Sequence, residues 1–192
     1  MEDEGEVEDL LSIEIHTEDK CVILRQRAYI EKLLATFAPD GKPISPFSGT
    51  RTLAAQPPGQ VPADIGLNKL VEDAVLQDVE SVDAKLLKDY QSLIGSLLYC
   101  AVNTRPDVAF AVGLLCRAMG RPTVELYEAA LRVLFYLHHH RHVGLRYEAD
   151  EAELAGQTDS DWAVKHSTTG YVFNYSVAAI SWASKKQATI AL

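Results

Sequence analysis

Two acidic side chains near the end of the chain have the type and spacing that metal-ion chemistry uses. Asp159 and Asp161 lie two residues apart in a stretch from Leu154 to Trp162 that can adopt an extended conformation. Because side chains alternate along a strand, both carboxylates would point to one face. Carboxylate oxygens bind hard divalent cations, of which Mg²⁺ is the expected one. Two acids are fewer than a two-metal centre needs, so exposed acids at the end of a strand are the alternative interpretation.

Four histidines suggest a second kind of metal site, one for zinc. His138, His139 and His140 are consecutive, and His142 follows after Arg141. Successive side chains of a helix point about 100° apart, so only His138 and His142 would share a face, and only if the helix continues that far. No acid or cysteine with ligand spacing joins them. Contact with phosphate, or simple solvation, is the preferred interpretation.

Basic side chains gather in the second half of the chain, although its net charge is −9. The first nine residues contain six acids, whereas residues 105–146 contain six arginines and three acids. A locally basic surface suits a phosphate backbone, and an ordinary solvated surface is the alternative. Two lysines near the end either contact nucleic acid or protect a strand edge from pairing with other chains. The candidate nucleic-acid contacts are Arg105, Arg117, Arg121, Arg132, Arg141, Lys185 and Lys186.

The elements that must position these residues begin with three consecutive helices. Apolar residues recur at three- and four-residue intervals through residues 84–143. Thr104 is predicted to cap the second helix, and Pro106 suits its first turn. This helix is predicted to extend through Met119 and, because it is apolar nearly all round, to be the buried one. Thr123 is predicted to cap the third helix.

Strand and linker signals flank the three helices. Residues 1–38 contain two short apolar runs and an amphipathic segment, which predict a β-hairpin followed by a helix. Residues 39–83 are rich in proline and glycine and are predicted to be a mostly irregular linker, with Leu67 to Val75 as a candidate short helix. Residues 144–192 predict antiparallel strands. The sequence therefore predicts an α+β fold.

Composition excludes several classes of protein. The 192 residues are 47% hydrophobic and 23% charged, which is typical of a globular protein. No apolar run is long enough to cross a bilayer, and the acidic start is unlike a signal peptide, so we expect an intracellular protein. Cys21, Cys100 and Cys116 form no C-x-x-C pair, which predicts reduced thiols. There is no Ser/His/Asp set, phosphate-binding glycine loop or cofactor fingerprint.

Several motifs in a fixed order carry a resemblance to a known family. The sequences SLIGSLLY and NTRPDVAFAV, with the helix that follows them, resemble the Ty1/copia class of retrotransposon polyproteins. TDSDWA, STTGYVF and ISWASKKQ resemble the opening strands of the ribonuclease H domain of that family. The hairpin and the YIEKLL helix are similar to the end of its reverse-transcriptase palm, although Ser12 stands where the family has a glycine.

The resemblance implies four segments and a parent enzyme. These are the end of a palm (1–38), a proline- and glycine-rich linker (39–83), a helical thumb or connection (84–143) and a truncated ribonuclease H-like β segment (144–192). The parent would be an RNA-directed DNA polymerase with Mg²⁺-dependent ribonuclease H activity, and Asp159 would match the first nuclease carboxylate. The polymerase motif Y-x-D-D is absent, and most nuclease acids are missing. The chain alone is therefore predicted to be catalytically inactive and to bind no cofactor productively.

The expected partners follow from the same resemblance. A thumb-like unit would bind the backbone of an RNA–DNA or DNA duplex weakly and without sequence preference, and the rest of the Pol polyprotein would be a partner if the chain is made as part of it. No membrane partner is expected. Two alternatives are a domesticated protein-interaction or structural module, and a metal-dependent nuclease completed by another chain.

Overall fold

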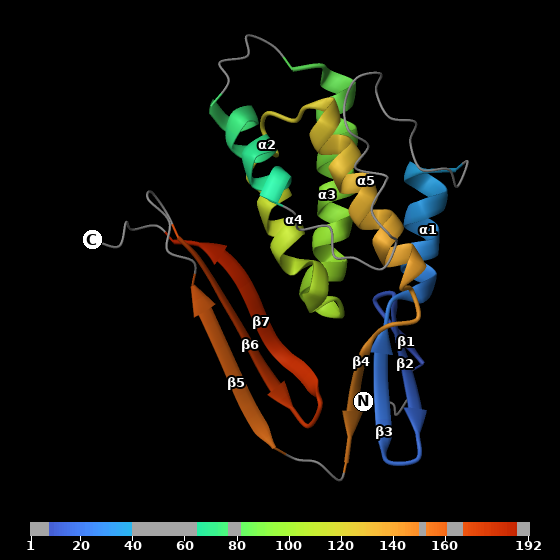
Figure 1. Ribbon diagram of the computed structural model, residues 1–192. Helices are drawn as coiled ribbons and strands as arrows, with labels where there is room; N and C mark the ends of the chain where they lie inside the picture. The colour runs from blue at the N-terminus through green and yellow to red at the C-terminus, as the bar shows by residue number, and fades with distance from the viewer. Residues whose placement is uncertain (1–7, 40–64, 77–81, 150–152, 161–166, 188–192) are drawn as a thin grey trace, which may run out of the picture.

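The described residues of the chain fold into five α-helices and two antiparallel β-sheets. The computed structural model describes residues 8–39, 65–76, 82–149, 153–160 and 167–187. Figure 1 shows the helices as one layer, with the two sheets side by side on the same side of it. This arrangement confirms the predicted α+β class.

The first sheet has the strand order β1-β2-β3-β4 and joins distant parts of the chain. β1 (Asp9–Leu10), β2 (Ile13–Glu18) and β3 (Cys21–Arg25) contain the expected N-terminal hairpin. β4 (Leu145–Glu148) pairs antiparallel with β3. The structure here differs from the sequence prediction, which grouped β4 with the C-terminal strands. No local pattern marks a pairing between segments so far apart in the chain.

Gly144 allows β4 to approach β3 closely. A Cβ atom at this position would lie 2.3 Å from the backbone oxygen of Leu24 and 2.8 Å from Cβ of Arg25. Those atoms belong to backbone or lie next to it, so they cannot move aside, and a larger residue would force the strands apart. The glycine at position 144 therefore allows the chain that follows α5 to enter the first sheet beside β3.

The second sheet has the strand order β5-β6-β7. It consists of β5 (Leu154–Ser160), β6 (Thr168–Tyr175) and β7 (Ala178–Lys186), all antiparallel as the sequence predicts. Its inner face carries Val172 and Trp182, which pack in a small cluster against β4. The other face is open to solvent.

The three predicted helices are present and form what we call the helical unit. They are α3 (Ala84–Asn103), α4 (Ala109–Cys116) and α5 (Val124–His139). Thr123 caps α5 as predicted, because its side-chain oxygen accepts a hydrogen bond from the backbone N–H of Leu126.

The second helix differs from its prediction at both ends. A 3₁₀ turn, η2 (Pro106–Val108), precedes α4, and Thr104 ends α3 rather than capping the next helix. The Thr104 hydroxyl instead donates a hydrogen bond to Oε1 of Gln26 at 2.8 Å. The side chain thus makes a tertiary contact and does not cap the second helix. At its other end α4 stops at Cys116 rather than Met119.

Two further helices pack against the helical unit. α1 (Arg27–Phe37) is the helix expected after the hairpin, whereas α2 (Ile65–Leu76) lies within residues 39–83, which the sequence assigned to a mostly irregular linker. The buried residues of α2 are Leu67, Val71 and Ala74. The weak apolar pattern thus marks a helix that docks on the core, which confirms the candidate short helix within the predicted linker. Residues 40–64 and 77–81 lie outside the described residues.

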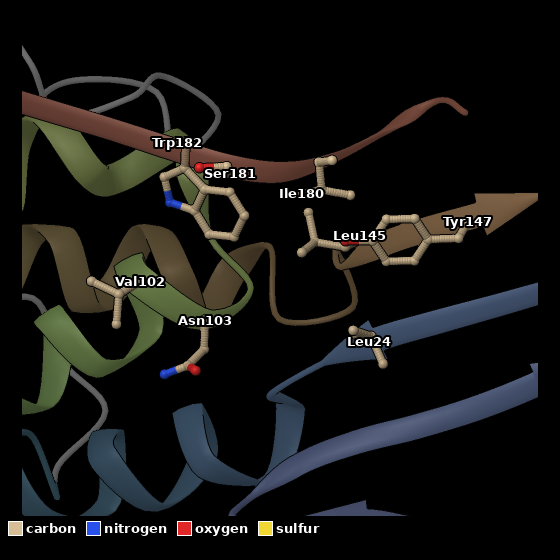
Figure 2. A pocket seen from close by; sticks show the side chains of 8 residues that line it. All are labelled: Leu24, Val102, Asn103, Leu145, Tyr147, Ile180, Ser181 and Trp182. Carbon is tan, nitrogen blue, oxygen red and sulfur yellow. The ribbon is translucent and has the colours of Figure 1, made fainter. Parts of the chain in front are cut away.

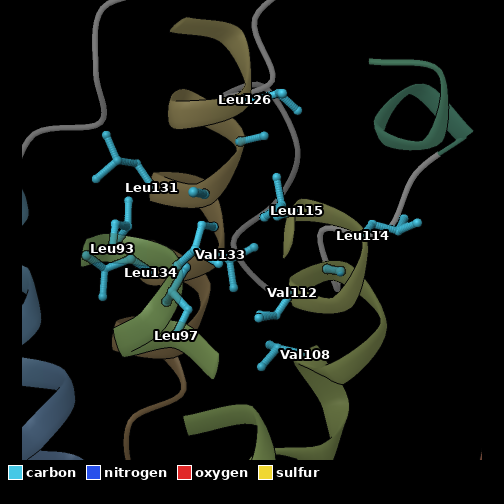
Figure 3. Packing of buried hydrophobic residues seen from close by; sticks show 14 of the residues in the cluster. Leu93, Leu97, Val108, Val112, Leu114, Leu115, Leu126, Leu131, Val133 and Leu134 are labelled. Carbon is cyan, nitrogen blue, oxygen red and sulfur yellow. The ribbon is translucent and has the colours of Figure 1, made fainter. Parts of the chain in front are cut away.

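One hydrophobic core joins all five helices. Figure 3 shows Leu93 and Leu97 of α3 facing Leu134 of α5, with Leu115 of α4 beside them. All four side chains are fully buried. The hydroxyl of buried Tyr90 donates to the backbone oxygen of Leu115 at 2.8 Å, which satisfies a polar group inside the core. None of the described helices has the length and apolar character needed to cross a membrane.

Candidate nucleic-acid interface

Asp159 lies on β5, at the end of the second sheet. It pairs with Gly170 of β6, and Gly170 pairs with Ser184 of β7. The carboxylate is exposed and accepts a hydrogen bond from the N–H of Ser160 at 2.8 Å. Asp161, the second predicted acid, lies outside the described residues.

The described residues around Asp159 do not make a magnesium site. Its neighbours across the sheet are a glycine and a serine, so no second carboxylate faces it from the described strands. Within the described parts of the chain, no three His, Cys, Asp or Glu side chains are grouped so that they could hold a metal ion. One carboxylate does not match the coordination that Mg²⁺ requires, and we assign no metal-dependent step to this site.

Three of the predicted cationic residues meet near the same end of the sheet. Arg117 follows α4, and its Nη2 donates to Oγ1 of Thr168 at 3.5 Å. Lys186 of β7 is the strand partner of Thr168, and Lys185 precedes it. Both lysines are exposed, and Arg117 is half-buried. We call Arg117, Lys185 and Lys186 the basic corner.

The alternation of side chains decides which of these groups share a face. Ser184 and Lys186 are two residues apart on β7, so they point to one face, on which Arg117 also lies. Asp159 and Gly170 are on that face too, because they line up with Ser184. Lys185 points to the opposite face. The corner therefore presents two cations and one carboxylate together, a set that can contact a phosphodiester through the cations.

Arg105 is part of the fold, and its prediction as a nucleic-acid contact is wrong. The residue is 1% exposed, and its guanidinium donates two hydrogen bonds to the Asp107 carboxylate, at 3.0 and 2.7 Å. It also donates to the backbone oxygen of His140, and the hydroxyl of Tyr136 donates to Asp107. Burial and the neighbouring Asp107 raise the pKa of Tyr136, which keeps this hydroxyl a donor. A guanidinium held in this way cannot reach a phosphate outside the protein.

The remaining predicted arginines are spread over the helices. Arg121 donates to the backbone oxygen of Val75 on α2 at 3.3 Å. Arg141 forms an ion pair with Glu31 of α1 at 3.1 Å. Arg132 is half-buried on α5. The structure thus groups only the three residues of the basic corner and leaves these arginines on other elements.

The histidine run ends α5 and does not form a ligand set. His138 and His139 are in the last turn, and His140 is the C-cap. The helix stops before His142, so the helical spacing that would bring His138 and His142 together is absent. Burial, followed by the charge of Arg141, lowers the pKa of His138 and favours its neutral form.

Sequence reasoning missed the contacts that attach the second sheet. Nε1 of Trp182 donates to the backbone oxygen of Ala101 on α3 at 2.7 Å, and the hydroxyl of Tyr147 on β4 donates to the oxygen of Ala179 at 2.7 Å. Beside them lies a cavity of about 310 Å³ between the two sheets (Figure 2). Its lining residues are Leu24, Val102, Asn103, Leu145, Tyr147, Ile180, Ser181 and Trp182. No local signal could reveal this site, because four separate elements supply it.

Comparison with known proteins identifies relatives of the whole chain. No family model and no solved structure matches it. The chain is 34% identical, over 200 residues that include 100% of it, to the retrovirus-related Pol polyprotein from transposon TNT 1-94 of Nicotiana tabacum. It is 31% identical, over 97% of its length, to a putative transposon Ty5-1 protein of Saccharomyces cerevisiae. It is also 42% identical over 108 residues, 54% of its length, to the secreted RxLR effector protein 161 of Plasmopara viticola.

The relatives differ in how much of their own length the chain covers. The aligned part is 14% of the Nicotiana tabacum polyprotein, 56% of the yeast protein and 76% of the effector. The match to the polyprotein extends over both sheets and the helical unit, since it includes the entire chain. The chain therefore belongs to the Ty1/copia-type retrotransposon Pol polyprotein family, of which it corresponds to a part.

Proposed function

We propose that this part of a Pol polyprotein binds the backbone of an RNA–DNA or DNA duplex without cleaving it. The basic corner carries the proposal, because the fold brings Arg117 of the helical unit next to Lys185 and Lys186 of the second sheet. The parent in which such a unit would act is an RNA-directed DNA polymerase with ribonuclease H activity, as the resemblance implies.

Backbone contact through this corner has two physical consequences. Cations that neutralise phosphates release counterions, so binding is independent of sequence and weakens steeply with salt. Asp159 shares the face of Lys186 and opposes the approach of phosphate, and the net charge of −9 acts in the same direction. We therefore propose weak binding, which low ionic strength makes measurable.

Binding of a labelled RNA–DNA duplex, measured by fluorescence anisotropy at several salt concentrations, tests this function. Lys186→Ala should weaken binding and reduce the slope of log K against log salt by roughly 0.9, the contribution of one phosphate contact. Lys88→Ala is the matched control, because Lys88 is an exposed lysine on α3 away from the corner. Equal effects of the two substitutions would show that the corner is not the interface.

The acidic start of the chain offers a second test of the same interface. Removal of residues 1–7 takes away four acids and keeps β1, which begins at Asp9. The removed carboxylates can no longer compete with phosphate for the cations of the basic corner. The shortened chain should therefore bind the duplex more tightly than the full chain. A shortened chain that shows no duplex binding at low salt would rule out the proposed role.

We further propose that the chain cleaves no RNA–DNA hybrid by itself. The sequence contains no Y-x-D-D, and Asp159 is the one acid on its face of the described strands. Incubation of a labelled hybrid with the chain and Mg²⁺ or Mn²⁺ should leave it intact. Cleavage that Asp159→Asn abolishes would instead establish a nuclease.

A second candidate function is that of a protein-interaction module. One observation favours it: a relative that shares 42% identity with half of this chain carries the name of a secreted effector, not of a polyprotein. Such a module would bind no duplex at low salt. The anisotropy experiment on the shortened chain therefore decides between the two candidates.

A further inference from the structure

The cavity between the two sheets has the size of a small-molecule site. Its volume of about 310 Å³ lies at the lower end of the range of such sites, about 300–1,000 Å³. β3, the end of α3, β4 and β7 supply its walls, and six of its eight lining residues are apolar or aromatic. Figure 2 shows the indole ring of Trp182 near the end of α3 that carries Val102 and Asn103, with Ile180 and Leu145 beside it. The cavity therefore combines apolar walls with the end of a helix.

The end of α3 supplies unpaired hydrogen-bond acceptors. The backbone oxygen of Val102 lacks its usual helical donor, because the residue four positions later is Pro106, which has no N–H. No other group donates to this oxygen among the described residues. Nδ2 of Asn103 donates to the backbone oxygen of Tyr99 at 2.7 Å, and its Oδ1 accepts from no donor in the described structure. Since the C-terminal end of a helix also carries about half a negative charge, this end of the cavity is electronegative.

Two aromatic rings in the cavity wall are held in place by hydrogen bonds of their own. Nε1 of Trp182 donates to the backbone oxygen of Ala101, and the hydroxyl of Tyr147 donates to the backbone oxygen of Ala179, both at 2.7 Å. Each ring therefore has its polar hydrogen already paired, and it does not need a ligand to satisfy it. The π-electrons of tryptophan and tyrosine attract cations, tryptophan most strongly. The rings thus favour a ligand of the same charge as the helix end does.

No cation of the chain lines the cavity. None of its eight lining residues is charged. The basic residues next to them in sequence form ion pairs with acids of the first sheet: Arg25 with Glu14 at 3.0 Å, and Arg146 with Glu148 at 2.8 Å. The net charge of −9 makes the surroundings more negative still. The electronegative end of the cavity is therefore not neutralised by a lining side chain.

We propose that this cavity binds a small organic cation with a planar amidinium or guanidinium head on an apolar body. The head donates hydrogen bonds to the acceptors at the end of α3 and lies against the ring of Trp182. The apolar body occupies the space between Leu145 and Ile180. Benzamidine is a simple molecule with both parts. The residues of the basic corner take no part in this site, so the inference does not depend on duplex binding.

Titration of the full chain with benzamidine at low ionic strength tests the proposal. Trp162→Phe leaves Trp182 as the only tryptophan, so a saturable change of fluorescence reports binding at the cavity. Benzamidine should bind about tenfold more tightly than benzamide, its neutral analogue of the same shape, because only the cation gains from the helix end and the rings. The anion benzoate should not bind. If benzamidine does not bind, or if benzamide or benzoate binds equally well, the inference is overturned.

Charge substitutions at the rim locate the site. Val102 lines the cavity and is 60% exposed, so it accepts a charged side chain without disturbing the core, and circular dichroism confirms folding. Val102→Lys should weaken benzamidine binding about threefold and Val102→Glu should strengthen it about threefold, while benzamide binding stays the same.

The controls separate this site from other charges of the chain. Ser92→Lys and Ser92→Glu make the same charges at an exposed position of α3 nearer its start, and they should leave benzamidine binding unchanged. Lys186→Ala should also leave it unchanged, although it weakens duplex binding, so the two proposals fail separately. Equal benzamidine affinity in Val102→Lys and Val102→Glu would show that the cation does not bind in this cavity.

Discussion

The helical unit and the second sheet are stabilised in different ways. Nearly all large buried side chains belong to the core that the helices share. The second sheet contributes two buried residues, Ala178 and Ala179, to a small cluster with Leu145 of β4. The rest of the stabilisation of this sheet comes from the hydrogen bonds between its strands and from a few side-chain hydrogen bonds, such as that of Trp182.

This difference separates the part that determines stability from the part that is free to bind. Burial of apolar surface is worth about 25 cal/mol per Å², whereas a hydrogen bond contributes only about 1 kcal/mol net. The helical unit should therefore unfold last, and the second sheet should open locally at lower cost. Lys185 and Lys186 of the basic corner lie on this less stable part, whereas Arg117 follows α4 of the helical unit.

The largest expected effect is a cavity in the helical core. Leu97→Ala should lower the free energy of unfolding by about 3–4 kcal/mol, because Leu97 is fully buried. Phe173→Ala, on the exposed face of the second sheet, should cost less than about 1 kcal/mol and is the comparison. Urea denaturation measures both values. Burial raises the pKa of Cys100 to about 12, so alkylation of this thiol should follow unfolding of the core and accelerate only in Leu97→Ala. Similar losses in both variants would contradict the contrast between the two parts.

The next effect concerns the ion pair between buried Arg105 and half-buried Asp107, after the end of α3. Arg105→Ala should destabilise the chain by about 2–3 kcal/mol, because it removes the charged partner of the Asp107 carboxylate and leaves it only the hydrogen bond from Tyr136 among its side-chain contacts in the described structure. The double variant with Asp107→Ala should lose less than the sum of the single effects, which a double-mutant cycle in urea would detect. If Arg105→Ala instead weakens duplex binding without changing stability, Arg105 contacts nucleic acid after all.

A smaller effect is expected where the second sheet joins the helices. Trp182→Phe keeps an aromatic ring but removes the N–H that donates to Ala101, a loss of about 1 kcal/mol. Hydrogen exchange should become faster in β6 and β7 while α3 remains protected. Tyr175→Phe, on the open face, is the control and should leave exchange unchanged. Equal acceleration in the helices would mean that the sheet and the helical unit open together.

The smallest effect concerns a turn of the first sheet. Ser12 adopts a φ of 65°, a conformation that costs a side-chain-bearing residue energy and costs glycine little. Ser12→Gly should therefore stabilise the chain by about 0.5 kcal/mol. Ser92→Gly, at an exposed position in the middle of α3, should destabilise it by a similar amount, because glycine is a poor helix former. Thermal unfolding of the two variants should shift in opposite directions, and a decrease for both would show that the turn is not strained.

The sequence by itself determined the elements that depend on neighbours in the chain. The spacing of apolar residues predicted the helical unit, and Thr123 was identified as a cap because capping involves residues three positions apart. The N-terminal hairpin and the strands of the second sheet followed from alternation within short runs. The family followed from the order of short motifs, which needs no tertiary contact.

Only the tertiary structure decided which chemically similar residues are available for binding. Arg105 and Lys186 are both cations in motifs of the resemblance, yet one is enclosed by Asp107 and His140 and the other is exposed beside Thr168. Likewise, β4 pairs with β3, although the sequence of β4 contains no signal that identifies β3 as its partner. Burial and strand pairing depend on which distant segments pack together, and residue type alone carries no such information.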